Sequence, residues 1–121
     1  MSAAASPITT HVLDTARGRP AAGVPITLAI AERTASGVTY RSLGQGQTDG
    51  DGRLRSLLPA ETALAPGIYR LTFDTAAYFQ ALGITGFYPE VAVSFQLTAP
   101  GEHYHVPLLL SPYGFSTYRG S

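Results

Sequence analysis

Hydrophobic and polar residues alternate along several short segments of the chain, and this alternation predicts β-strands. The strands are expected at residues 8–14, 24–32, 37–47, 67–74, 89–98 and 102–112, with a last short candidate at 113–118. Thirteen glycines and nine prolines separate runs rich in Val, Ile, Thr, Tyr and Phe. This texture is typical of an antiparallel all-β domain.

Two segments depart from the strand pattern. In TAAYFQALG, residues 75–83, the apolar positions fit two turns of helix that a glycine would end, so we expect one short helix over about 75–82. In TDGDGRL, residues 48–54, two Asp-Gly pairs predict a tight turn with positive φ. The segment from 33 to 47 carries several glycines and has the weakest strand pattern.

Strand periodicity places the histidines, because successive side chains of a strand point to opposite faces. The segments 8–14 and 102–112 each have one apolar face for the core and a second face that carries histidine. These second faces hold Thr9, His11 and Leu13 on the first strand, and His103, His105, Pro107 and Leu109 on the other. A monomer would expose this partly apolar face to water, so we expect another subunit to cover it.

Length and composition exclude several classes of chemistry. The 121 residues fit one domain, residues 1–121, in which we expect 1–7 to be flexible. All eight basic residues are arginine and there is no cysteine. The absence of lysine excludes Schiff-base chemistry and a Walker-type phosphate loop. The absence of cysteine excludes disulfides, thiol nucleophiles and thiolate-bound metals.

Charge and hydropathy point to a soluble protein. The formal net charge is zero, so no nucleic acid or membrane partner is expected. No segment approaches the roughly 20 apolar residues that a membrane helix needs. The first residues, MSAAASPITTHVLD, lack a basic region followed by a long apolar run, so no secretory signal is expected. We therefore predict a cytoplasmic location.

Four segments together resemble the transthyretin family, and within it the 5-hydroxyisourate hydrolases. They are HVLDTARGRPAAGVPITL, TDGDGR, GIYRLTFDTAAYFQALG and, above all, HYHVPLLLSPYGFSTYRGS at the end of the chain. The resemblance runs from about residue 8 to residue 121, and 33–47 is its least recognisable part. It implies a two-sheet antiparallel β-sandwich with one short helix, assembled as a homotetramer that is a dimer of dimers.

The resemblance also implies an activity. It predicts hydrolysis of 5-hydroxyisourate, a purine-derived molecule of urate degradation, to 2-oxo-4-hydroxy-4-carboxy-5-ureidoimidazoline, with no cofactor and no metal. The hydrolase pattern places catalytic residues at His11, Arg53, His105 and Ser121. It places substrate-binding residues at His11, Arg53, Tyr118, Arg119 and Gly120.

Each of these residue types suits a part of the reaction. Hydrolysis needs an activated water, a stabilised carbonyl oxygen and a positioned substrate. A histidine has an ordinary pKa of about 6.5 and suits the activation of water, so His105 and His11 are both candidates, with His105 favoured as the base. Arg53 offers a planar fork of donors for an anionic purine edge. The last residue, Ser121, would bring a hydroxyl and an α-carboxylate into the site, which makes the end of the chain part of its wall.

Other interpretations of the same residues stay open. The same fold hosts carriers of small aromatic ligands, so a binding module that carries such a ligand in the tetramer channel is the alternative function. His103 and His105 share a face and could chelate a metal with His11 as a third ligand. His103 is otherwise expected at the rim of the site. Asp49 and Asp51 hint at a calcium loop, but turn chemistry explains them.

Overall fold

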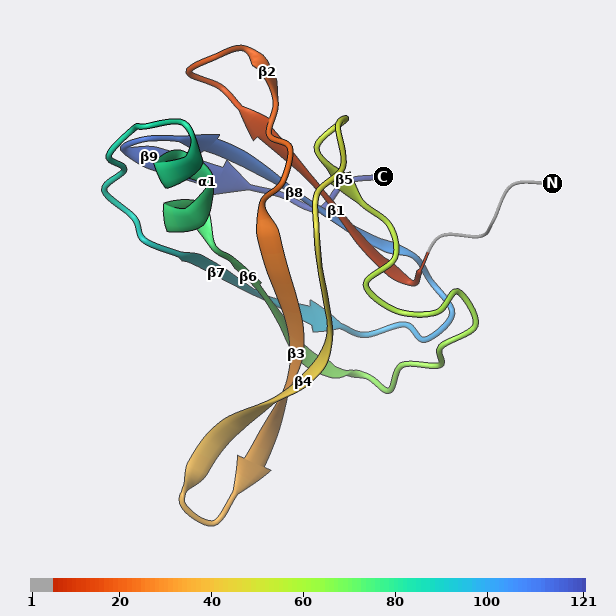
Figure 1. Ribbon diagram of the computed structural model, residues 1–121. Coiled ribbons are helices and arrows are strands. Elements are labelled where there is room, and N and C mark those ends of the chain that lie inside the picture. The colour runs from red at the N-terminus through yellow and green to blue at the C-terminus, as the bar shows by residue number, and fades with distance from the viewer. Residues whose placement is uncertain (1–5) are drawn as a thin grey trace, which may run out of the picture.

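Two β-sheets packed face to face make up the chain in a computed structural model that describes residues 6–121 (Figure 1). The elements in chain order are β1 (Ile8–Asp14), β2 (Arg19–Pro20), β3 (Pro25–Thr34), β4 (Gly37–Gln47), β5 (Arg53–Leu54), β6 (Gly67–Phe73), α1 (Thr75–Ala81), β7 (Val91–Leu97), β8 (Tyr104–Ser111) and β9 (Gly114–Thr117). The predicted sandwich with one short helix is confirmed.

The strand order separates the chain into one sheet of five strands and one of four. The first sheet runs β2-β1-β8-β9, with β5 also paired to β1, and the second runs β4-β3-β6-β7. All pairs are antiparallel except β1 with β8, which run parallel. The expected antiparallel sandwich therefore contains one parallel pair, which the long connection between β1 and β8 permits and a short hairpin would not.

Alternation along β1 and β8 places their apolar faces in the core, as predicted. Val12 of β1 and Leu108 of β8 are both fully buried and occupy neighbouring positions in the sheet. Leu28, Leu71 and Phe73 cover them from the second sheet and are equally buried. The burial of large apolar side chains between the sheets is the main stabilising contribution to this fold.

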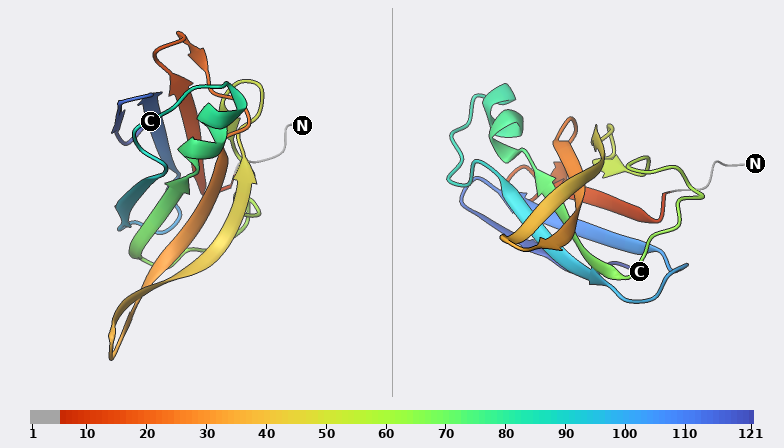
Figure 2. Two further views of the ribbon diagram at one scale, coloured as in Figure 1. Left: turned by 60° about the vertical axis from the view of Figure 1, so that its left-hand side comes forward. Right: turned by 90° about the horizontal axis from the view of Figure 1, so that it is seen from below.

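The helix α1 covers one end of the sandwich (Figure 2). The Asp74 side chain caps its first turn by accepting a hydrogen bond from the Ala77 N–H at 3.0 Å, and Gly83 follows its last turn with a φ of 71°. The buried Tyr78 hydroxyl donates to the Asp14 carboxylate at 2.7 Å, which ties α1 to the end of β1. At seven residues this helix is far too short to cross a membrane, and no other helix occurs among residues 6–121.

The segment 33–47 holds the end of β3, the turn after it and the whole of β4, so the strand predicted at 37–47 is confirmed. The outer part of this β3–β4 hairpin is exposed and projects beyond the other strands (Figures 1 and 2). Residues 1–5 of the segment expected to be flexible lie outside the described residues. Ser6 is buried and donates its N–H to the Arg55 carbonyl at 3.0 Å, while the Pro7 carbonyl accepts from the Tyr104 N–H at 2.9 Å. These two residues are thus hydrogen-bonded into the first sheet.

Candidate active site

The parallel pairing of β1 with β8 brings the histidines of both strands to one face of the first sheet. In this register Thr9 lies opposite His105, and His11 lies opposite Pro107. Their side chains point away from the core, and both histidines are half-buried. The sequence predicted this shared orientation from periodicity, and the structure adds that the two strands are direct neighbours.

Arg53 joins this face from the other side of β1. Strand β5 places it directly opposite His11 in the sheet. The Asp49 carboxylate shapes the preceding turn by accepting the N–H groups of Asp51 at 2.9 Å and Arg53 at 3.0 Å. The predicted Asp-Gly turn therefore has a clear role, which is to direct an arginine toward the histidines.

Gly52 allows the turn to approach β1 closely. Its φ is 75°, and its carbonyl accepts the Val12 N–H at 2.7 Å. A Cβ at this position would lie 2.5 Å from the Val12 carbonyl oxygen. Only glycine combines this positive φ with so short a distance to a neighbouring strand, and this fixes the register of Arg53.

The ring of His105 is held from two sides. Its Nδ1 lies 2.8 Å from the Thr9 hydroxyl oxygen, so its Nε2 remains available for other partners. On the other side Gly120 forms a bridge to β8 and donates its N–H to the His105 carbonyl at 2.7 Å. A Cβ on Gly120 would lie 2.5 Å from Cδ2 of the imidazole. Gly120 belongs to the terminal tetrapeptide, residues 118–121, and it is the residue that leaves room for this ring.

A cavity of about 210 Å³ opens where these groups meet. Its lining residues are Thr9, Thr10, Arg53, Arg55, His103, His105 and Ser121. Four of the residues predicted for the site thus lie at or beside one cavity: Arg53, His105 and Ser121 line it, and Gly120 packs against the ring of His105. His11 lies next to Arg53 in the sheet but does not line this cavity.

Tyr118 and Arg119 lie elsewhere. Both line a separate cavity of about 220 Å³ with Phe95 of β7 and Tyr104 of β8. The Arg119 guanidinium lies 4.3 Å from the centre of the Tyr104 ring and donates to the Glu102 carboxylate at 3.0 Å. Within one chain the terminal tetrapeptide therefore contacts two cavities. Gly120 and Ser121 lie at the cavity of His105, and Tyr118 and Arg119 lie at the neighbouring one.

The electrostatics of the face favour the neutral forms of His105 and His11. Burial, followed by the positive charge of Arg53, lowers the pKa of His105 below its ordinary value, and His103 and His11 act in the same direction. Burial and Arg53 also lower the pKa of His11, against an opposing hydrogen bond to the backbone of Asp51. A neutral imidazole at Nε2 can accept a proton, so this environment suits a base that works near neutral pH.

Sequence reasoning did not single out Thr9, Thr10 or Arg55. Thr9 shares a strand face with His11, and this was the available signal, but a threonine on a strand has no chemistry that distinguishes it. His103 was expected at the rim, and the structure places its exposed ring 2.9 Å from the Thr9 hydroxyl. Among residues 6–121 no group of three or more His, Asp or Glu side chains is arranged to hold a metal ion.

Comparisons with known proteins agree with the resemblance drawn from the sequence. Residues 8–120 match the HIUase/Transthyretin family. The chain is 46% identical over 121 residues to a 5-hydroxyisourate hydrolase of Salmonella typhi, covering 100% of this chain and 85% of that protein. It is 44% identical to a 5-hydroxyisourate hydrolase of Mus musculus, covering 100% of both.

Solved structures include both functional branches of the fold. A 5-hydroxyisourate hydrolase of Klebsiella pneumoniae superimposes with a TM-score of 0.77 at 33% identity, covering 94% of this chain and 98% of that one. Sea bream transthyretin in complex with thyroxine superimposes with a TM-score of 0.83 at 32% identity, covering 94% of each chain. Backbone similarity therefore does not separate a hydrolase from a carrier, and the side chains of the site must do so.

Proposed function

The chain belongs to the HIUase/Transthyretin family, and we propose that it hydrolyses 5-hydroxyisourate in urate degradation. The observation that carries the proposal is the meeting of His105 and Arg53 in one polar cavity, with His11 beside them on the same sheet face. This arrangement offers a proton acceptor next to a cation, and both groups can accelerate ring hydrolysis. An apolar channel for a hydrophobic hormone would need neither group.

His105 acts as the general base in this proposal. Its Nδ1 is occupied by Thr9, so Nε2 is the atom that takes a proton from the attacking water. Attack on a ring carbonyl and cleavage of its bond to nitrogen leave a carboxylate and a protonated nitrogen. Arg53 binds the substrate and stabilises the negative charge that develops on the carbonyl oxygen. His11 orients the water or the substrate beside Arg53.

The terminal tetrapeptide completes the site. Ser121 lines the cavity and is proposed to hydrogen-bond the substrate, while Gly120 positions the ring of His105. Tyr118 is 57% exposed, and with Arg119 it is proposed to reach a substrate only in the assembled protein. These roles follow the hydrolase pattern of the sequence.

The assembly proposed is a homotetramer, a dimer of dimers. Several large apolar side chains of the chain are exposed, including Phe87, Tyr113 and Phe115 at 67%, 75% and 43%. Tyr88 packs edge-on against Phe87 and Phe115, and these three side chains form one aromatic cluster at the end of the sandwich. A subunit contact would remove this surface from water. Light scattering on the purified protein would measure the subunit number. A cytoplasmic location stays a prediction that cell fractionation would test.

One experiment tests the activity. Freshly generated 5-hydroxyisourate, made from urate with urate oxidase, is followed by its absorbance with wild-type protein and with His105→Ala. Arg33→Ala, an exposed change on the projecting hairpin, serves as the matched control. We expect fast decay with wild type and control, and a rate near that of the uncatalysed reaction with His105→Ala. Decay at the uncatalysed rate with folded wild-type protein would instead favour the carrier function.

A further inference from the structure

The hydroxyl group of Thr9 lies between two histidines: His105 of β8, and His103, the residue just before β8. The Thr9 Oγ1 lies 2.8 Å from Nδ1 of His105 and 2.9 Å from Nε2 of His103. Thr9 is 4% exposed, so its hydroxyl sits out of solvent between the two rings. The rings stack at 6.5 Å between centroids with an interplanar angle of 19°. The three side chains thus form one continuous hydrogen-bonded chain.

A hydroxyl carries one proton, and this number constrains both rings. If Thr9 donates to His103, then His105 must donate its Nδ1–H to Thr9, and Nε2 of His105 carries a lone pair. If Thr9 donates to His105, then His103 must donate its Nε2–H, and Nε2 of His105 carries a proton. The tautomers of the two histidines are therefore coupled through Thr9. In the first state His105 is a base toward the cavity, and in the second it is an acid.

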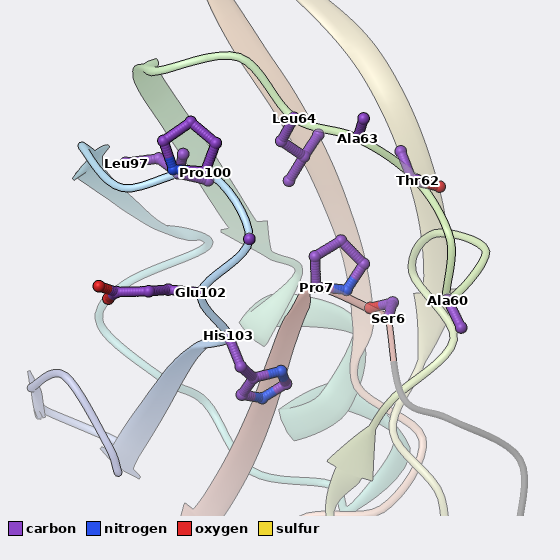
Figure 3. A pocket seen from close by; sticks show the side chains of 11 residues that line it. Ser6, Pro7, Ala60, Thr62, Ala63, Leu64, Leu97, Pro100, Glu102 and His103 are labelled. Carbon is purple, nitrogen blue, oxygen red and sulfur yellow. The ribbon is translucent and has the colours of Figure 1, made fainter.

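His103 also lies between two cavities. It lines the cavity of His105, and it lines a larger one of about 340 Å³ on its other side. Figure 3 shows the ring of His103 at one end of this second cavity, with Leu64 and Pro100 at the other end and with Pro7 and Ser6 along one side. Since the ring is exposed, it can exchange protons with solvent away from the substrate.

We propose that Thr9 and His103 are positioning residues that form a proton relay from His105 to the second cavity. The relay lets His105 serve first as the base for the attacking water and then as the acid for the leaving nitrogen. This inference rests on the proposed hydrolysis, since it concerns the same site.

The proton movements balance over one turnover. His105 takes the proton of water at Nε2, passes its Nδ1 proton to Thr9, and Thr9 passes its own proton to Nε2 of His103. His103 is then cationic and releases its Nδ1 proton to solvent in the second cavity. In the second half, His105 gives its Nε2 proton to the leaving nitrogen, the same steps run backwards, and His103 regains a proton from solvent. One proton leaves and one returns, and all three side chains recover their starting state.

The charged groups around the relay favour a neutral His105 ring at rest. Besides His103, three charged or titratable groups face His105: Arg53 of β5, Arg55 directly after β5, and His11 of β1. Glu102 and Arg119 lie near His103, where Arg119 pairs with the Glu102 carboxylate and reaches the His103 carbonyl at 3.4 Å. Two arginines near His105 disfavour a lasting positive charge there, so a route that removes a proton from this ring has a clear use.

Enzyme kinetics test the relay with three substitutions. Thr9→Val keeps the shape of the side chain and removes the hydroxyl, Thr9→Ser keeps the hydroxyl, and His103→Gln keeps a hydrogen-bonding group that does not titrate. We expect Thr9→Val and His103→Gln to lower kcat about tenfold to a hundredfold, with KM within about twofold. Thr9→Ser should restore kcat to within about threefold of wild type. The double variant Thr9→Val/His103→Gln should be no slower than either single one, because both break the same chain. Wild-type kcat in Thr9→Val, or losses that multiply in the double variant, would overturn the relay.

A measurement without substrate separates this inference from the proposed activity. The chain has three histidines, so nitrogen-15 NMR can assign each ring with His103→Gln as one reference and read its tautomer. We expect Thr9→Val to change the tautomer populations of both His103 and His105 and to leave His11 unchanged. Unchanged populations at both rings would overturn the relay even if the enzyme is active. If Thr9→Val changes the tautomer populations of both rings but the wild-type protein does not hydrolyse 5-hydroxyisourate, the hydrogen-bonded chain is supported and only the proposed activity is rejected.

Discussion

Replacing Gly120 by alanine would place a methyl group against the ring of His105. The new Cβ would lie 2.5 Å from Cδ2 of the imidazole and 3.3 Å from its Cγ and from Cγ of Pro107. Non-bonded carbon atoms prefer separations of about 3.5–4.0 Å, so the ring must retreat by about 1 Å or the backbone must move. The Gly120 N–H is held at 2.7 Å by the His105 carbonyl, and the ring is held at 2.8 Å by Thr9.

The expected effect is on activity. A displacement of about 1 Å in a catalytic group can cost about a hundredfold in rate, which corresponds to about 2.7 kcal/mol of activation free energy. We therefore expect Gly120→Ala to lower kcat/KM for 5-hydroxyisourate by about a hundredfold. The free energy of unfolding should change by less than about 1 kcal/mol, because Gly120 lies outside the apolar core.

The assay follows 5-hydroxyisourate decay for Gly120→Ala beside urea denaturation of the same preparation. Gly114→Ala is the matched control, since Gly114 lies in the adjoining β9 and the nearest atom to its added Cβ is Ser111 Oγ at 3.7 Å. The control should keep wild-type kcat/KM. If Gly120→Ala keeps wild-type kcat/KM as well, the ring of His105 does not need its observed position. If both variants lose activity and both form smaller oligomers than the wild type, the reasoning about a local displacement is wrong.

Two further predictions concern charge and a buried hydrogen bond. Arg53 lowers the pKa of His105, so the fall of kcat/KM on acidification should occur below pH 6.5. Arg53→Gln removes this charge, so it should move this acid limb of the pH profile to higher pH and should also lower kcat/KM. Tyr78→Phe removes the hydrogen bond to the buried Asp14 carboxylate and should lower the free energy of unfolding by about 1.5–3 kcal/mol in urea denaturation at neutral pH.

Controls make both results specific. Arg33→Gln removes an exposed charge on the hairpin and should leave the acid limb in place. A limb that stays in place in the Arg53 variant would show that this arginine does not act on the titrating group. Tyr113→Phe removes a hydroxyl from a side chain that is 75% exposed and should leave stability unchanged. Equal stability of the two tyrosine variants would contradict the role given to the Asp14 contact.

Much of the fold could be read from the sequence because alternation reports which side of a strand is buried. The strands 8–14 and 37–47 were predicted with the bounds that the structure has, and the helix was predicted to within one residue. The same alternation placed His11 and His105 on faces away from the core. The two-residue strands β2 and β5 were not predicted as strands, since two residues have no period to detect, and β5 lies in the segment that was expected as a turn.

The site depended on contacts that alternation does not specify. Period and polarity determine the face of a residue, but they do not determine which strand lies beside it or in what register. The parallel register of β1 with β8 places Thr9 against His105, and no local feature of the sequence predicts a pairing between residues almost a hundred positions apart. For the same reason the sequence treated Tyr118 and Arg119 as neighbours of Gly120 in one site, whereas the structure assigns them to another cavity.

By itself, the sequence determined the strands, their buried faces, the turn before Arg53 and the residue types available for chemistry, because these follow from local sterics and side-chain chemistry. Only the tertiary structure decided that one threonine hydroxyl would lie between two histidines and that a glycine would leave room for one of their rings. Such contacts arise where strands distant in sequence meet, so they depend on the packing of the whole chain.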